Sequence, residues 1–130
     1  MILAQDAFAQ TKPLTLDGQP PLIFAHRGAS GYLPEETLEG YQKAASWGPV
    51  YLEGDLYFSK DGVLIYSHDA TLNRTTNVVE AAKTDPVLAA AGVKKGKKKD
   101  KQYYIQDLDL AEIKTLKALP GKGTLNTKRS

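Results

Sequence analysis

The stretch Leu22-Ile23-Phe24-Ala25-His26-Arg27-Gly28 decides the fold, because an apolar run ends there in residues suited to binding or chemistry. Four consecutive apolar residues, 22–25, predict a β-strand buried on both faces, as in a parallel sheet. The glycine- and proline-containing residues 28–34 predict a loop, and residues 36–47 predict a helix capped by Thr37. A strand, a loop and a helix in this order are typical of the start of an α/β fold.

Two further strands follow this helix in the sequence. Residues 50–58 predict a continuous second strand, and residues 63–67 predict a third. Between them, Lys60-Asp61-Gly62 contains the strong hairpin signal Asp-Gly, so we expect the third strand to pair antiparallel with the end of the second. The helix has an apolar face that we expect to pack on the sheet, formed by Leu38, Tyr41, Ala44 and Ala45.

The second half of the chain shows weaker patterns. Residues 69–108 predict an insertion without strong periodicity, which includes a short helical segment at 87–93 and a short extended piece at 103–105. Residues 110–119 predict a final helix with Asp109 as its N-cap. Its apolar stripe consists of Leu110, Ile113, Leu116 and Leu119. The two clearly predicted helices, at 36–47 and 110–119, are too few to cover both faces of these apolar strands. We therefore expect the chain to have too few elements to bury its own sheet.

The composition excludes several classes of protein. The 130 residues suit one domain, and 42% hydrophobic and 25% charged residues are ordinary for a globular protein. The chain has no cysteine, so it forms neither a disulfide nor a thiolate metal site. A net charge of +2 gives no argument for nucleic acid, and the basic stretch 94–101 reads as a solvated loop without interleaved aromatic residues. We expect no nucleic-acid partner and no stable membrane insertion.

The N-terminal residues 1–20 predict a lead-in segment before the domain at 21–130. Ala7-Phe8-Ala9 resembles the end of a secretory signal peptide, although the basic region and full apolar core of such a peptide are missing. A frayed tail explains the same residues equally well. We expect a periplasmic or secreted protein, with a cytoplasmic one as the alternative.

Both histidines of the chain, His26 and His68, follow apolar runs, and two carboxylates lie between them in the sequence. Histidine titrates near neutral pH and is therefore suited to proton transfer. Successive strand side chains alternate between faces, so Glu53 and Asp55 point the same way. A hard divalent cation would remove the cost of burying them together, with water or substrate oxygens completing its shell. A pair of carboxylates on a solvent-facing edge strand is the alternative.

The neighbours of the histidines also suggest roles. The guanidinium of Arg27 can bind phosphate oxygens in bidentate fashion, and Gly28 lets the backbone approach closely. The alternative for Arg27 is a salt bridge with Glu35 or Glu36. The alternative for His26 is a structural role as a hydrogen-bonded core residue. Adjacent strand residues point apart, so we expect Asp69 to accept a turn hydrogen bond rather than to pair with the histidine before it.

Several segments, taken in order, resemble the signature of the glycerophosphodiester phosphodiesterases. They are His26-Arg27-Gly28 continuing to Pro34-Glu35-Glu36-Thr37, Glu53-x-Asp55, Ser59-Lys60-Asp61-Gly62 and His68-Asp69-x-x-Leu72-x-Arg74-Thr75-Thr76. The match is specific across residues 22–77. Residues 103–108 and 112–114 resemble the longer periplasmic branch of the family more weakly.

The resemblance implies a TIM barrel of the phosphatidylinositol-phospholipase-C-like type, within the α/β class. It implies hydrolysis of a small-molecule glycerophosphodiester to sn-glycerol 3-phosphate and an alcohol, with Ca²⁺ or Mg²⁺ as the cofactor. By position in the motifs, His26 and His68 correspond to the catalytic acid–base pair and Arg27 to the substrate-binding arginine. Glu53 and Asp55 correspond to metal ligands.

Two neighbouring glutamates differ in what the resemblance implies for them. Glu35 matches the glutamate of the family's Pro-Glu-Asn-Thr motif, which lies in or beside the metal and phosphate site, so it is a further candidate metal ligand. Glu36 stands where the family has asparagine, and no role is assigned to it.

The length of the chain limits these expectations. A complete (β/α)₈ barrel takes about 250 residues, so we expect only its N-terminal part here. We expect the third acidic metal ligand of the family beyond residue 130.

Two other hypotheses fit the same order of histidines and carboxylates. One is a sphingomyelinase D-like phospholipase, which shares the histidine and carboxylate pattern. The other is an inactive truncated fragment.

Overall fold

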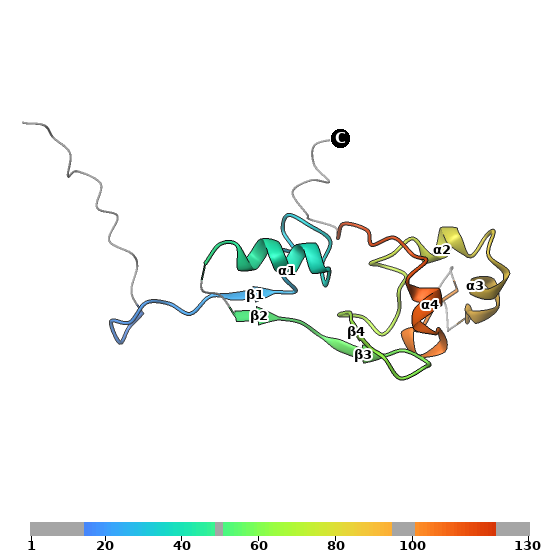
Figure 1. Cartoon of the computed structure of the whole chain (residues 1–130), viewed down its shortest axis with the longest axis horizontal. Coiled ribbons are helices and arrows are strands. Elements are labelled where there is room, and N and C mark those ends of the chain that lie inside the picture. Colours follow the sequence, from blue (N-terminus) through green and yellow to red (C-terminus); the bar gives the residue numbers. More distant parts are fainter. Residues whose placement is uncertain (1–14, 49–50, 95–100, 122–130) are drawn as a thin grey trace, which may run out of the picture.

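The computed structural model describes residues 15–48, 51–94 and 101–121. Short elements follow one another along these residues, with long loops between them (Figure 1). In chain order they are β1 (Phe24–His26), α1 (Leu38–Ala45), β2 (Tyr51–Glu53), β3 (Leu56–Phe58), β4 (Leu64–Tyr66), α2 (Val78–Ala81), α3 (Pro86–Ala91), the 3₁₀ turn η1 (Ile105–Asp107) and α4 (Leu110–Ile113).

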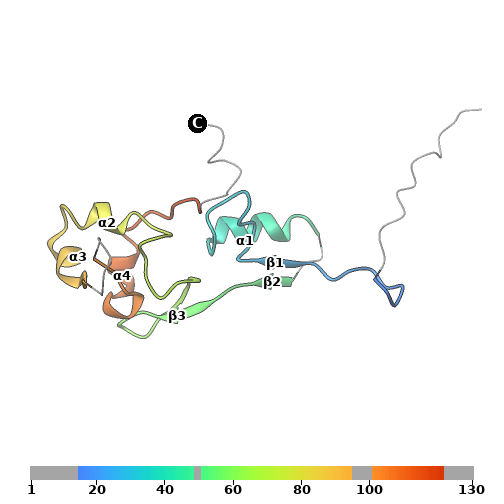
Figure 2. The same cartoon turned by 180° about the vertical axis from the view of Figure 1, so that it is seen from behind.

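A βαβ unit forms one end of the molecule. β1 pairs parallel with β2, and α1, which connects them, lies along the two strands in both views (Figures 1 and 2). This arrangement confirms the predicted α/β opening. The register places Phe24 beside Tyr51 and His26 beside Glu53. The parallel pairing therefore brings a predicted proton-transfer residue next to a predicted metal ligand.

Small residues carry the packing of α1. Thr37 caps the helix as predicted, since its Oγ1 accepts a hydrogen bond from the Gly40 backbone nitrogen at 3.2 Å. The predicted apolar face is wrong in part, because Gly40 and Ala44 are buried whereas Leu38 is 68% exposed. Within the part of the chain that the structure describes, the buried hydrophobic cluster here consists of Ala25, Ala29 and Ala44. The helix backbone therefore lies close to the loop that follows β1.

The predicted strand at 50–58 is divided into two. β2 ends at Glu53 and β3 begins at Leu56, because the backbone nitrogen of Asp55 binds a Glu36 carboxylate oxygen at 3.2 Å instead of a strand partner. β3 then pairs antiparallel with β4, with Tyr57 opposite Ile65. This pairing confirms the predicted hairpin around the Asp-Gly turn.

The strands are more exposed than their sequence predicts. Phe24 is 60% exposed, and neighbouring apolar residues of β2, β3 and β4 are also exposed, so the expectation of a strand buried on both faces is wrong for the described residues. Within residues 15–48, 51–94 and 101–121, β1 and β2 form a sheet of two strands, as do β3 and β4. The described elements are too few to cover these surfaces, as the small number of predicted helices suggested.

The main hydrophobic core lies in the segment that the sequence predicts as an insertion. α2, α3 and α4 gather at the opposite end of the molecule from α1 (Figures 1 and 2). α3 confirms in part the helical segment predicted at 87–93, whereas α2 was not predicted. The buried residues of this core are Leu72, Val78, Ala82, Leu88, Tyr103, Ile105 and Leu108. The segment is therefore a packed unit rather than a polar loop.

The predicted helix at 110–119 is also shorter than expected. α4 ends at Ile113, although its start agrees with the prediction and Asp109 forms a capping box with Glu112. The following residues pair elsewhere, since the Leu119 nitrogen binds the Thr75 carbonyl oxygen at 2.8 Å. These long-range hydrogen bonds compete with continuation of the helix.

Some predictions fall outside the described residues. These are the signal-like Ala7-Phe8-Ala9, most of the basic stretch 94–101, the tail at 122–130, and residues 49–50 at the end of the first helix and the start of the second strand. Among the residues that the structure does describe, no helix is long and apolar enough to cross a membrane.

Candidate active site

Arg27 occupies an unusual backbone conformation at the end of β1. Its φ is +58°, in the left-handed region that non-glycine residues seldom adopt. The backbone nitrogen of Arg27 donates to the Glu53 carbonyl oxygen at 3.0 Å and to the Glu53 carboxylate at 3.1 Å. The carbonyl oxygen of Arg27 accepts a hydrogen bond from the Glu36 backbone nitrogen at 3.2 Å. Strained backbone held by several contacts is concentrated at functional sites, so this turn marks a candidate site.

The carboxylates predicted to hold a metal lie around the same turn. A Glu53 carboxylate oxygen lies 4.0 Å from His26 Nε2, and an Asp55 oxygen lies 4.0 Å from Arg27 Nε. Both carboxylates are partly exposed, and so is His26, whose side chain is 67% exposed. The structure therefore brings four of the predicted site residues to one end of β1 and β2.

The Arg27 guanidinium is held between acidic residues. Its Nη1 lies 3.4 Å from a Glu35 carboxylate oxygen, so the alternative of a salt bridge to Glu35 is part of the structure. Its Nε is buried and has no hydrogen-bond partner among the described residues. A buried donor without a partner costs free energy, and an anionic ligand oxygen would remove that cost. The two observations are compatible, since the contact with Glu35 uses Nη1, whereas Nε lies 4.0 Å from Asp55 without forming a hydrogen bond.

His68 joins the site through a chain of ion pairs. Its Nδ1 lies 2.8 Å from Asp69 Oδ1, and Asp69 Oδ2 accepts from Arg74 Nε at 2.6 Å. Arg74 also donates to both Glu35 oxygens, at 2.8 and 2.7 Å. Glu35 in turn pairs with Arg27, and the Arg27 backbone nitrogen binds the Glu53 carboxylate beside His26. Ion pairs and hydrogen bonds therefore connect the two histidines. The prediction that Asp69 would not pair with His68 is wrong, because the chain turns directly after β4.

These contacts shift the proton affinities of the acidic residues. The hydrogen bonds from Arg74 hold the pKa of the Glu35 carboxyl below its usual value, against the opposing effect of burial. Arg74 likewise lowers the pKa of Asp69, and the His68 hydrogen bond adds to this effect. Both carboxyls are therefore ionised at neutral pH. The two carboxylates together raise the pKa of Arg74, which keeps its charge.

Glu36 and Tyr41 support the site from the side of α1. One Glu36 carboxylate oxygen accepts from the Asp55 backbone nitrogen at 3.2 Å, and the other accepts from the Tyr41 hydroxyl. The Tyr41 hydroxyl also lies 3.2 Å from the Glu53 carbonyl oxygen. Burial and the Glu36 carboxylate raise the Tyr41 pKa, so this hydroxyl remains a donor. Glu36 therefore positions the backbone between the two candidate metal ligands.

The sequence patterns do not predict the residues that support the site. Glu36 has no predicted role, because it stands where the family motif has asparagine. That difference was the available signal, since a carboxylate at this position can accept hydrogen bonds from the backbone and from Tyr41. Arg74 stands in the quoted segment after His68, and its fixed spacing from that histidine was the available signal. Tyr41 was placed on the apolar face of the helix, where its hydroxyl had no predicted partner.

The oxygen ligands at the end of β2 are of the type that a hard divalent cation binds. Glu53 and Asp55 offer partly exposed carboxylate oxygens, the ligands that Ca²⁺ and Mg²⁺ prefer. Within the described residues, however, no group of three or more histidine, aspartate or glutamate side chains is close enough together to hold an ion. Both oxygens of Glu35 bind Arg74. These residues therefore supply two ligands, and a cation there would need further oxygens.

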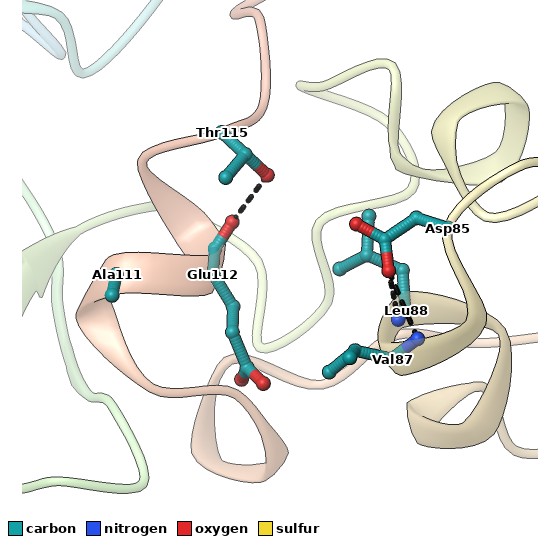
Figure 3. Close-up of a pocket in the computed structure, with 6 residues that line it drawn as sticks. All are labelled: Asp85, Val87, Leu88, Ala111, Glu112 and Thr115. Carbon is teal, nitrogen blue, oxygen red and sulfur yellow. Dashed lines mark hydrogen bonds between the residues drawn. The ribbon is translucent and has the colours of Figure 1, made fainter.

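A cavity elsewhere does not offer a comparable site. A pocket of about 240 Å³ lies between α3 and α4, and Figure 3 shows the residues that line it. Its two acidic residues are engaged in helix caps, because Asp85 accepts from the Val87 and Leu88 nitrogens and Glu112 accepts from the Asp109 nitrogen. Among the described residues that line the pocket, the charged groups are these two carboxylates, and each uses one oxygen to cap a helix. A second pocket, of about 260 Å³, borders His26 and includes Tyr32 and Trp47.

The chain matches one protein family and several known proteins. Residues 26–130 match the model of the glycerophosphoryl diester phosphodiesterase family. A glycerophosphodiester phosphodiesterase of Haemophilus influenzae is 44% identical over 95 residues, covering 73% of this chain and 23% of that protein. One from Arabidopsis thaliana is 38% identical over 113 residues, covering 85% of this chain and 28% of that protein.

Solved structures agree with the fold. The chain matches a glycerophosphodiester phosphodiesterase of Agrobacterium tumefaciens with a TM-score of 0.54 and 30% identity, covering 82% of this chain and 35% of that one. It matches an Oleispira antarctica phosphodiesterase in complex with the product sn-glycerol-3-phosphate with a TM-score of 0.55, 30% identity and coverage of 82% and 33%. The chain thus has the α/β fold of part of these TIM-barrel structures, and spans about a quarter of the curated relatives.

Proposed function

The chain belongs to the glycerophosphoryl diester phosphodiesterase family, and we propose that it carries the first part of an active site that hydrolyses glycerophosphodiesters. The products would be sn-glycerol 3-phosphate and an alcohol. One observation carries the proposal. Arg27, whose buried Nε forms no hydrogen bond within the described residues, is linked through ion pairs and hydrogen bonds to both His26 and His68.

The chemistry of these residues supports a phosphodiester substrate. Arg27 offers a planar set of donors for the phosphate oxygens, and its Nε has no competing hydrogen bond among the described residues. The structure of the Oleispira antarctica relative is a complex with the product sn-glycerol-3-phosphate. The same anion would satisfy the Arg27 donor here. Charge that develops on the phosphate oxygens in the transition state would be stabilised by this guanidinium.

The two histidines are suited to the two proton transfers of the reaction. One imidazole would take the proton of the attacking hydroxyl or water, and the other would give a proton to the leaving alkoxide. Both side chains are accessible to a ligand, since His26 is 67% and His68 is 41% exposed. Glu53 lies 4.0 Å from His26 Nε2, where its carboxylate would stabilise the charged imidazolium.

A divalent cation belongs to this proposal as cofactor. Glu53 and Asp55 would hold it, with the remaining ligands coming from water, from substrate or from oxygens outside the described residues. When bound, the ion would neutralise phosphodiester charge and lower the pKa of the attacking hydroxyl. The backbone contact between Glu36 and Asp55 would keep the two ligands in place.

The proposal is tested by assaying the purified chain with glycerophosphocholine and measuring glycerol 3-phosphate. We expect product in the presence of Ca²⁺ or Mg²⁺ and its loss with a chelator. His26→Ala and His68→Ala are each expected to lower the rate at least about 100-fold, the usual contribution of a general acid or base. Lys83→Met, in an exposed ion pair away from the site, is the matched control. Product formation that survives both histidine substitutions would contradict the proposal.

A second candidate is an inactive member of the family. It is favoured by the supply of only two candidate metal ligands among the described residues and by the exposed apolar strands. A titration with sn-glycerol 3-phosphate separates the two candidates. Chemical-shift changes at both histidines without hydrolysis would favour a binding-competent but inactive chain.

A further inference from the structure

The contact between His68 and Asp69 restricts the protonation of the imidazole. His68 Nδ1 lies 2.8 Å from Asp69 Oδ1, within hydrogen-bond distance. An ionised carboxylate accepts hydrogen bonds and cannot donate them. Asp69 is ionised at neutral pH, because the hydrogen bond from Arg74 lowers its pKa. The proton between the two groups therefore belongs to His68 Nδ1.

Arg74 determines where the Asp69 carboxylate lies. Its Nε donates to Asp69 Oδ2 at 2.6 Å, while its two Nη groups donate to the two Glu35 oxygens at 2.8 and 2.7 Å. The Glu35 side chain is only 9% exposed, so it is a fixed anchor for the guanidinium. With three donors committed, the Arg74 plane cannot rotate without breaking a contact on one side or the other.

We propose that Arg74 is a positioning residue, which holds Asp69 so that His68 keeps its proton on Nδ1 and exchanges protons with the substrate through Nε2. This inference rests on the proposed function, in which His68 is one of the two proton-transfer groups. It adds that Nδ1 of that imidazole forms the hydrogen bond to Asp69, whereas Nε2 exchanges protons with the substrate. It also gives Glu35 a role as the anchor of Arg74.

Solvent makes the role of Arg74 necessary. The side chains of His68 and Asp69 are 41% and 29% exposed, so water competes for the hydrogen bond between them. An exposed carboxylate on a freely rotating side chain would hold an imidazole only weakly. Arg74 removes that freedom by binding the opposite oxygen of Asp69. Loss of Arg74 should therefore weaken the tautomer preference of His68 without removing any atom of the imidazole or of Asp69.

The tautomer is measured directly by long-range ¹H–¹⁵N NMR spectra of the labelled 130-residue chain. The chain contains only two histidines, so the two imidazoles give separate and assignable signals. A neutral imidazole carries one proton, on one of its two ring nitrogens, and the two nitrogens have distinct shifts. We expect His68 to show a protonated Nδ1 and an unprotonated Nε2. An unprotonated Nδ1 in the unsubstituted chain would overturn the proposal, without any variant.

The variants test the role of each partner. Asp69→Asn and Arg74→Met are both expected to move the His68 nitrogen shifts toward a mixture of tautomers, with His26 as an internal reference. Lys83→Met, which removes an exposed lysine of a separate ion pair, is expected to leave the spectra unchanged. A His68 signal that is the same in folded Arg74→Met as in the original chain would show that Arg74 has no positioning role.

The tautomer is measured without substrate, so its outcome is separate from that of the hydrolysis assay. Hydrolysis by a chain whose His68 is protonated on Nε2 would overturn the positioning role and leave the proposed function standing. The Nδ1-protonated form in a chain without hydrolysis would support the positioning of His68 and contradict the proposed function.

Discussion

At the scale of single residues, the turn after β1 depends on two adjacent left-handed positions. Arg27 has a φ of +58° and Gly28 has a φ of +75°. Arg27 accepts this strain because its backbone is held by Glu53 and Glu36. Gly28 has a further constraint, since a Cβ atom there would lie 2.9 Å from the backbone carbon of Gly40. The close approach of the loop to α1 thus requires glycine.

Gly28→Ala is expected to destabilise the chain by more than about 1 kcal/mol, because a left-handed conformation alone costs 1–2 kcal/mol for a residue with a Cβ atom. The clash with the backbone of Gly40 adds to this cost. Gly31→Ala is the matched control, since a Cβ atom there meets nothing within 4 Å. The midpoints of urea unfolding measure both effects. Equal midpoints for the two variants would contradict the close approach.

The ion pairs of Arg74 predict a dependence of stability on pH. Arg74 lowers the pKa of Glu35 and of Asp69 in the folded state, so folding favours their ionised forms. The resulting stability is present above their ordinary values of 4.5 and 3.8, and is lost as the pH falls through the lower folded values.

Arg74→Met should flatten this acid dependence. Thermal unfolding at a series of pH values from 6 downward, to about two units below the ordinary carboxyl pKa values, checks the expectation. The original chain should lose stability more steeply below pH 4.5 than the variant does. Lys83→Met should retain the original slope, because its partner Glu80 is exposed. A steeper acid dependence in Arg74→Met would reverse the expected sign.

The sequence could predict the identity of the site residues but not their contacts. The motifs singled out His26, His68, Arg27 and the carboxylates at 53 and 55, and the structure brings these into one network. Whether each performs its implied role stays a prediction. The link through Arg74 joins residues 39 positions apart, Glu35 and Arg74, which no local pattern contains. Glu36 was equally hidden, because its partner is a backbone nitrogen rather than a side chain.

At the scale of elements, caps and tertiary hydrogen bonds decide where helices begin and end. Thr37 and Asp109 were predictable caps because their side chains act within three residues of sequence. The end of α4 was not predictable, because residues 114–119 continue an apolar pattern. The backbone of residues 117–119 instead bonds to residues 75–77, more than thirty positions away. Local propensity therefore determined the starts of these helices and long-range pairing determined this end.

Asp85 at the start of α3 tests the importance of a cap. Its carboxylate accepts from the Val87 and Leu88 backbone nitrogens at 2.9 and 3.2 Å (Figure 3). Asp85→Ala should cost about 1 kcal/mol, the typical value for loss of an N-cap. Asp85→Asn keeps an acceptor oxygen and should cost much less. Chemical unfolding of the two variants compares them, and an equal loss would show that charge rather than capping matters.

At the scale of the whole molecule, the apolar core and the candidate site lie in different parts. The core of residues between Leu72 and Leu108 belongs to the segment that the sequence predicted as an insertion. Among the described residues of the βαβ unit that carries His26 and Arg27, the buried hydrophobic cluster consists of three alanines. Sequence patterns missed this division because the core combines short helices, a 3₁₀ turn and isolated bridges, none long enough to show a period.

A pair of leucine substitutions tests where the stability of the chain resides. Leu88 is almost fully buried in the core, so Leu88→Ala should cost about 2–5 kcal/mol. Leu38, which the sequence places on the apolar face of the first helix, is 68% exposed. Leu38→Ala should change the stability by less than about 0.5 kcal/mol. Urea unfolding of both variants decides, and a larger effect at Leu38 would contradict the observed burial.

The two-stranded sheet of β1 and β2 has a consequence for handling the protein. Among the described residues, each of these strands pairs along one side only, and Phe24, Tyr51 and Leu52 are exposed beside the unpaired backbone groups. Such edges are templates for pairing with other chains. Aggregation at high concentration is therefore the main hazard in purifying this chain. Short holding times and dilute samples should preserve it better than added sulfate or phosphate, which strengthen apolar association.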